Sequence, residues 1–296
     1  MALGYIGHEK NFVYINGDPL LDVTSVDSSI SSNRTVINMG GVAKALQVSE
    51  GVSQATMSVD RYVISETSQD PFATNGLYVN GFTGVWQHLD ATGGNKFFGM
   101  TTGYVNDYNF TAAVNSIPST SMGMVAYGSG IGQIDIPTGY MTGATSADFL
   151  AAYIYPKNIE LAFNEANTLS GIVTTNRVQS FSLSFSMNRE VRNRLGQIKK
   201  MPETFISYPF EATLSIDIDV DEYSIPAINS LLCQDPEDIN IYLKKCDGTI
   251  FRGFRFTSGV IQSASMNEEV TDINTATLEY TRYLTNDADL DFWMPF

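Results

Sequence analysis

Hydrophobic and polar residues alternate with a period of two along much of the chain, a pattern typical of β-strands that bury one face. The clearest example is the stretch 180–187, where Phe181, Leu183, Phe185 and Met187 alternate with four serines. In residues 212–221 an aliphatic row alternates with a second row made of Thr213, Ser215, Asp217, Asp219 and Asp221. Each strand is therefore expected to have one buried face and one wet face, as in an antiparallel sheet that is solvated on one side.

Both stretches occur a second time, in altered form, earlier in the chain. Residues 23–38 match residues 178–193 in register, sharing the leading Val, three serines, an Asn-Arg pair, a second Val and the closing Asn. The sequence Ala-Thr-Met-Ser-Val-Asp at 55–60 matches Ala-Thr-Leu-Ser-Ile-Asp at 212–217. Because two matched blocks recur in the same order, the sequence predicts an internal duplication.

The duplication divides the chain into a first β domain at residues 1–130, a connecting segment at 131–152 and a second β domain at 153–296. The connecting segment begins within a glycine-rich run at 128–132, which lacks the Lys-Ser/Thr and the following helix of a phosphate-binding loop. We expect a mainly β fold of two tandem antiparallel sandwich or barrel domains.

A flanking helix is expected in the second domain at residues 223–232, which has Ser224 as its cap and Pro226 in its first turn. The strongest turn signal in the chain is Asp247-Gly248, which predicts a hairpin between residues 239–246 and 249–256. Further strands are expected at 260–266 and 275–284, and in the first domain at 77–86, 97–105 and 122–127.

The charge balance argues against a protein that binds nucleic acid over its surface. The 296 residues carry 17 Lys and Arg against 32 Asp and Glu, a formal net charge of -15. Such a chain repels a polyanion. No apolar run has the length of a membrane span and the start has no signal-peptide pattern, so we expect synthesis in a cytoplasm and no membrane anchor.

No pattern of catalytic or metal-binding residues stands out. The two histidines, His8 and His88, have no ligand spacing, and Cys233 and Cys246 are expected to be reduced. The Asp217-x-Asp219-x-Asp221 row places three carboxylates on one strand face, either as a cation site or as a solvated acidic face. The second interpretation is favoured because no loop ligands accompany the row, so we expect no enzyme, no metal and no cofactor.

Residues 178–194 and 210–232, read as a long strand, an extended arm, a return strand and a helix, resemble the tail-tube superfamily of bacteriophages, which includes baseplate tube and type VI secretion needle proteins. The resemblance implies a structural virion protein whose rings stack into a hollow tube for DNA passage. The chain would then assemble with itself, as three two-domain chains or as six chains per ring. Its other partners would be further tail proteins of the baseplate, terminator and sheath, with DNA as passing cargo.

Two alternatives stay open at this point. One is a baseplate hub or tube-initiator ring, which has the same fold but does not polymerise. The other, from a different class, is a carbohydrate-binding or adhesin-type β-sandwich.

Two groups of functional residues are expected. The first faces the channel, since it lies opposite the apolar rows of the repeated strands: Asp60, Asp217, Asp219, Ser58 and Ser215. The second is a basic island in the link 189–208, expected to be an arm that becomes ordered only when it docks on an acidic face of an adjacent subunit: Arg189, Arg192, Arg194, Lys199 and Lys200.

Overall fold

The structure is a computed structural model, which describes residues 11–20, 23–37, 47–63, 81–89, 95–127, 131–133, 156–163, 177–192, 203–219, 236–267 and 275–295. The first half contributes β1 Asn11–Ile15, β2 Asp18–Leu20, β3 Val23–Ile37, β4 Gln47–Tyr62, β5 Phe82–Leu89, β6 Asn95–Ala113, β7 Ser119–Tyr127 and β8 Ile131–Gln133. The second half contributes β9 Asn158–Phe163, β10 Val178–Ser186, β11 Arg189–Arg192, β12 Glu203–Ile206, β13 Phe210–Asp219, β14 Glu237–Lys244, β15 Ile250–Asn267, β16 Thr275–Leu284, the 3-10 helix η4 Asp287–Asp291 and β17 Trp293–Pro295. The prediction of a mainly β fold is confirmed.

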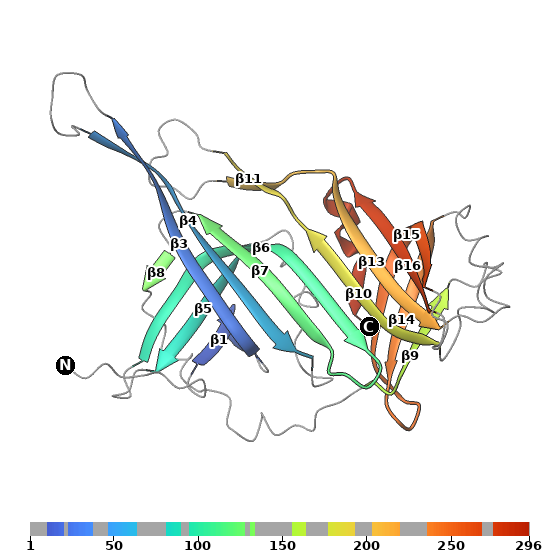
Figure 1. Ribbon diagram of the computed structural model, residues 1–296. Helices are drawn as coiled ribbons and strands as arrows, with labels where there is room; N and C mark the ends of the chain where they lie inside the picture. The colour runs from blue at the N-terminus through green and yellow to red at the C-terminus, as the bar shows by residue number, and fades with distance from the viewer. Residues whose placement is uncertain are drawn as a thin grey trace.

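The two halves have the same strand order, so the duplication inferred from sequence extends to the whole topology. The first unit runs β3-β4-β7-β6-β5-β1 and the second runs β10-β13-β16-β15-β14-β9. The matched strand pairs also share an irregularity, since the ladder shifts between Val23 and Ser25 in one unit and between Val178 and Ser180 in the other. All the pairings are antiparallel (Figure 1).

One long strand in each unit bends and belongs to two layers. β6 pairs with β5 through its first half and with β7 through its second. β15 does the same with β14 and β16, so the two strands expected at 249–256 and 260–266 are one. The bend lies at Ser258 and Gly259, where a Cβ on the glycine would lie 2.7 Å from the Phe256 ring. A pairing of Val178 with Ile159 then closes the second unit into a six-stranded barrel.

A backbone ladder joins the two units. β10 pairs with β13 on one side and with β6 of the first unit on the other, from Ser180 opposite Ala113 to Ser186 opposite Asp107. Eight strands therefore follow one another across both units in the order β3-β4-β7-β6-β10-β13-β16-β15. We call these strands the wall sheet and the β6–β10 ladder the internal joint (Figure 1).

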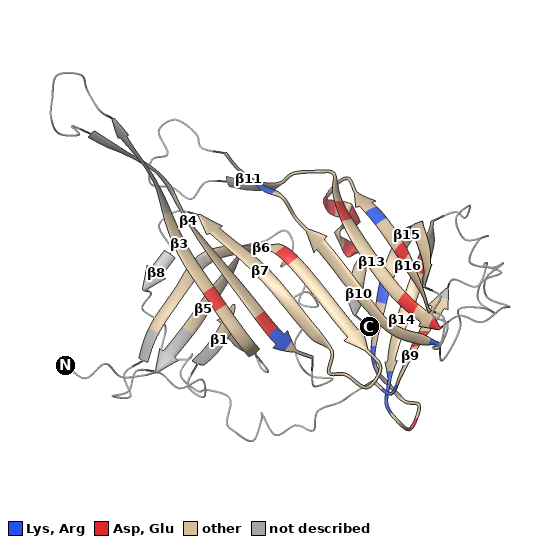
Figure 2. Ribbon diagram, in the orientation of Figure 1, with Lys and Arg blue, Asp and Glu red and all other residues tan. Residues whose placement is uncertain are grey.

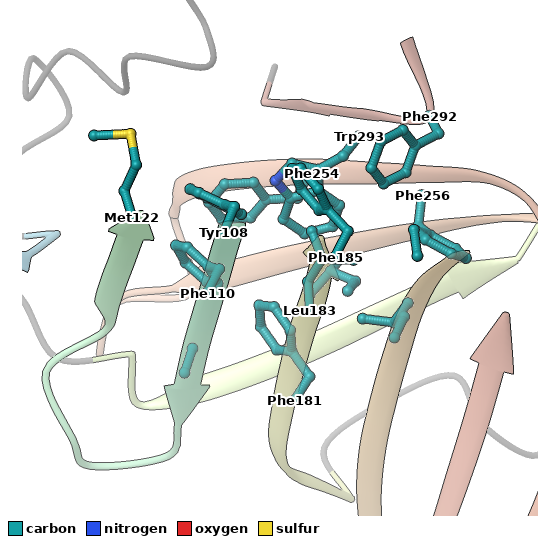
Figure 3. Close-up of a cluster of buried hydrophobic side chains, with 14 of the residues drawn as sticks. Tyr108, Phe110, Met122, Phe181, Leu183, Phe185, Phe254, Phe256, Phe292 and Trp293 are labelled. Carbon is teal, nitrogen blue, oxygen red and sulfur yellow. The ribbon is translucent and has the colours of Figure 1, made fainter. Parts of the chain in front are cut away.

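Aromatic side chains cover the back of the internal joint. Phe110 of β6 is fully buried, with its ring centroid 4.6 Å from that of Phe254 and 5.5 Å from that of Phe181. Trp293 of β17 stacks on Phe254 at 4.8 Å (Figure 3). The apolar core is therefore continuous from one unit to the other.

Several boundaries differ from expectation or lie beyond the described residues. β8 pairs with β6 at Phe98 to Met100, so the first unit extends to Gln133 instead of ending at residue 130. The helix expected at 223–232 lies outside the described residues, and the flanking helix is not confirmed. The hairpin at Asp247-Gly248 is confirmed, with Gly248 at a φ of 82° and the Asp247 carboxylate accepting a hydrogen bond from the Thr249 N–H.

Candidate channel-lining face

The wall sheet has one apolar and one polar side in both units. Apolar side chains such as Met57, Phe110, Leu183 and Leu214 point into the core. The opposite side, which we call the polar face, carries mainly hydroxyl, amide and carboxylate groups. Among its residues are Ser25, Asp27, Ser29 and Ser31 of β3; Thr56, Ser58 and Asp60 of β4; Ser119 and Ser121 of β7; Asp107, Asn109 and Thr111 of β6; Ser180, Ser182, Ser184 and Ser186 of β10; Glu211, Thr213, Ser215, Asp217 and Asp219 of β13; Thr275, Thr277 and Glu279 of β16; and Ser263 and Ser265 of β15.

A serine on the neighbouring strand holds the corresponding carboxylate in each unit. The hydroxyl of Ser25 donates to Oδ2 of Asp60 at 2.5 Å, and that of Ser180 donates to Oδ2 of Asp217 at 2.5 Å. Thr277 adds a second donor to Asp217 at 2.7 Å. Hydrogen bonds to an ionised acceptor are stronger than neutral ones, so these carboxylates are fixed along the wall.

Three further acids of the polar face also accept hydrogen bonds from neighbouring side chains. Nε2 of Gln179 donates to Asp219 at 2.6 Å, and the hydroxyl of Ser263 donates to Glu279 at 2.9 Å. At the internal joint the hydroxyl of Ser186 donates to Asp107 at 2.5 Å. Sequence reasoning missed Asp107, although Asp107, Asn109 and Thr111 alternate with apolar residues in the pattern that identified the other strands.

The charge at the wall-strand positions of this face is negative, whereas Arg189 of β11, outside the wall sheet, also lines its larger recess. The acids that lie on it are Asp27, Asp60, Asp107, Glu211, Asp217, Asp219 and Glu279, and Figure 2 shows acidic positions on wall strands of both units. In the strand segments 25–31, 54–62, 107–113, 119–127, 178–186, 210–219, 260–267 and 275–284, no Lys or Arg occupies a polar-face position; Arg34 of β3 lies beyond them, opposite Glu50. The two arginines within those segments point away from it, since Arg61 donates to the buried hydroxyl of Thr120 and Arg282 donates to the carbonyl of Thr257.

The polar face is hollowed. An open recess of about 600 Å³ lies over β3, β4, β7 and β6, and its lining includes Asp27, Thr56, Ser58, Asp107 and Arg189 of β11. A second recess of about 390 Å³ lies over β7, β6, β10 and β13. The two recesses share Asp107 and Gly123, so the hollow extends across the internal joint.

The five residues predicted to line a channel all lie on this polar face. Asp60, Asp217, Asp219, Ser58 and Ser215 are half-buried, and the structure brings them onto one continuous surface although they come from two repeats. That this surface faces a bore stays a prediction. Within the described ranges, no group of three or more His, Cys, Asp or Glu side chains is placed to hold a metal ion.

Arg189 does not belong to a free basic arm. Its guanidinium lies 4.9 Å from the centroid of the Tyr104 ring, and its Nε donates to the carbonyl of Val105 at 2.8 Å. Burial lowers the pKa of Arg189 to about 10. The side chain therefore anchors the start of the arm to the first unit of its own chain, and the prediction that it docks on a neighbour is corrected.

The two ends of the arm are ordered within the single chain. β11 and β12 pair from Arg189 opposite Ile206 to Arg192 opposite Glu203, which corrects the expectation that the whole link becomes ordered only on assembly. The hydroxyl of Tyr208 donates to Asp287 at 2.6 Å, and burial followed by this hydrogen bond raises the pKa of Tyr208. The side chain of Arg192, and Arg194, Lys199 and Lys200, lie outside what is described.

In the described part of the chain, no helix has the length and apolar character needed to cross a membrane. The sequence matches no model of a known protein family, and a comparison with characterised proteins found no significant relative. The geometry of the polar face is thus the basis for a functional assignment.

Proposed function

We propose that the protein is a structural subunit of a bacteriophage tail tube, in which homo-oligomeric rings stack around a channel for DNA. The observation that carries the proposal is the polar face, which is hollow and continuous across two repeated units. The wall strands line it mainly with hydroxyl, amide and carboxylate groups, and Arg189 of β11 is the one cation among the residues that line its two described recesses. This combination suits a surface past which a polyanion slides.

The electrostatics favour passage over binding. Double-stranded DNA carries one negative charge per about 1.7 Å of axis, and proteins that hold it do so by replacing counterions with Lys and Arg. The wall strands carry Asp60, Asp107 and Asp217 and offer no such replacement. Arg189, which also lines the hollow, is held by the Val105 carbonyl and the Tyr104 ring. A serine hydroxyl donates to each of these carboxylates, which fixes the positions of the acidic side chains along the wall.

The repeated topology also suits a ring. Each unit presents the same side of the same four strands to the polar face, so two successive units already form a segment of wall. A ring built from such chains contains pseudo-equivalent units, whether three chains or six complete it.

Electron microscopy of the purified protein at rising concentration tests the proposal. Hollow tubes, or closed rings with the polar face toward the lumen, are expected. Rings that never stack, even when seeded with tail baseplates, would support the baseplate hub or initiator ring instead. Compact monomers at every concentration, or rings with Asp60 and Asp217 on the outer surface, would overturn the tube function.

A further inference from the structure

The wall sheet ends in two strand edges. β3 pairs with β4 alone among the described strands, and residues 263–267 of β15 pair with β16 alone. An open edge presents unpaired backbone N–H and C=O groups that can accept another strand. Folded proteins usually protect such edges with Lys or Pro, yet residues 25–31 and 263–267 contain neither.

The duplication identifies the structural counterpart of each edge inside the chain. β3 corresponds to β10, because Ser25 and Ser180 hold the equivalent positions opposite Asp60 and Asp217. β15 corresponds to β6, because each is the long bent strand of its unit and its ladder shifts between Val105 and Asp107 or between Ile261 and Ser263. The free edges are thus the counterparts of the two strands that form the internal joint.

We propose that β3 of one copy of the chain pairs antiparallel with β15 of a second copy, in the register of the internal joint. In that joint Ser182, Ser184 and Ser186 lie opposite Thr111, Asn109 and Asp107. Transferred through the repeat, the same register places Ser29 opposite Ser265 and Ser31 opposite Ser263. The inference specifies how the rings of the proposed function close.

The side chains at the two edges fit this joint. Met266 is the counterpart of Phe110, which is 0% exposed in the internal joint, whereas Met266 is 37% exposed. Ile30 is the counterpart of Phe185 and is 52% exposed, whereas Phe185 is buried against Tyr108. Both apolar side chains lie on the core side of their strands, so the proposed pairing would cover them and keep the polar face unbroken.

The geometry of the joint is heterologous, since one edge of each chain meets the other edge of the next. Such contacts form closed rings when the rotation per step divides a full turn. Internal and external joints would then alternate around the ring, and every ring would contain an even number of units. Native mass spectrometry counts them as multiples of the 32.5 kDa chain.

Disulfide trapping tests the register. In a background with Cys233→Ser and Cys246→Ser, one chain carries Ser29→Cys and a second chain carries Ser265→Cys. Directly opposed residues lie within the Cα separation that a disulfide needs. Mild oxidation of the mixture should give a covalent dimer. Oxidation of either variant alone should give only the small amount of dimer that random collisions produce.

The matched control is Asp27→Cys mixed with Ser263→Cys. In the proposed register these residues are displaced by four positions along the strands, about 13 Å, which exceeds the reach of a disulfide. Equal trapping of the control pair, or no trapping of Ser29→Cys with Ser265→Cys under conditions where rings are seen, would overturn the joint.

A second variant distinguishes an effect on self-association from an effect on the stability of the monomer. Met266→Glu buries an unpaired charge only if the edge is covered, so it should weaken self-association about tenfold or more while thermal unfolding of the monomer changes little. Unchanged association would overturn the inference. A trapped dimer without hollow assemblies would support the joint and refute the tube. Hollow assemblies without the trapped pair would support the tube and refute the joint.

Discussion

The free energy of unfolding should depend far more on Phe110 in the internal joint than on Met266, its counterpart at the free edge. Phe110 is fully buried among Phe181, Phe254 and Trp293, and truncation of a buried Phe to Ala costs about 3–5 kcal/mol. That is a large fraction of the about 5–15 kcal/mol that stabilises a typical domain. Met266→Ala removes a partly exposed side chain from an equivalent strand position, and should cost less than about 0.5 kcal/mol in the monomer.

Urea denaturation at a concentration where the chain is monomeric measures both effects. Fluorescence of Trp86 and Trp293 reports one position in each unit, so a split of the transition would show that the units have become uncoupled. The reasoning fails if Phe110→Ala lowers the free energy of unfolding by less than about 1 kcal/mol. It also fails if Phe110→Ala and Met266→Ala have the same effect.

Three further predictions concern the polar face, the arm and pH. Replacing Asp60, Asp217 and Asp219 together by Lys should leave assembly intact but create salt-sensitive DNA binding, which fluorescence anisotropy of labelled DNA measures. Replacement of the same three residues by Asn is the control, and equal anisotropy with both variants would contradict a wall that repels DNA. Charge reversal at Arg192, Arg194, Lys199 and Lys200 should slow assembly measured by light scattering, and unchanged kinetics would indicate a solvated arm. The raised pKa of Tyr208 means that the folded chain keeps a proton that the unfolded chain loses above about pH 10, so stability present below that pH is lost above it. Tyr208→Phe should flatten this alkaline loss, and an identical pH profile would contradict the assignment.

Local pattern predicted much of the fold. The alternation in residues 180–187 and 212–220, and its copy in the first unit, identified β10, β13, β3 and β4 because side-chain direction in a strand has a period of two. The five polar-face residues followed from the same rule. The same alternation continues through residues 107–112 of β6, but Asn106, Asp107 and Asn109 are also typical of turns, so the strand was expected to end at residue 105.

The internal joint could not have been predicted from local pattern. Its ladder connects residues 107–113 with residues 180–186, and no short-range propensity encodes which distant strands pair. Arg189 was misassigned for a related reason. Sequence shows its charge among other basic residues, while its burial against Tyr104 depends on a strand from the other unit.

The irregular ladder positions that the two units share have a consequence for the fidelity of folding. A strand that slips by one residue exchanges its two faces, so a slipped β4 or β13 would carry Asp60 or Asp217 into the apolar core. Burying an unpaired carboxylate costs several kcal/mol or forces it to take up a proton. The bulges next to Ser25 and Ser180 fix the register at the point where these acids meet their serine donors. The acids of the wall thus also favour the correct strand register, because each destabilises the slipped pairing that would bury it.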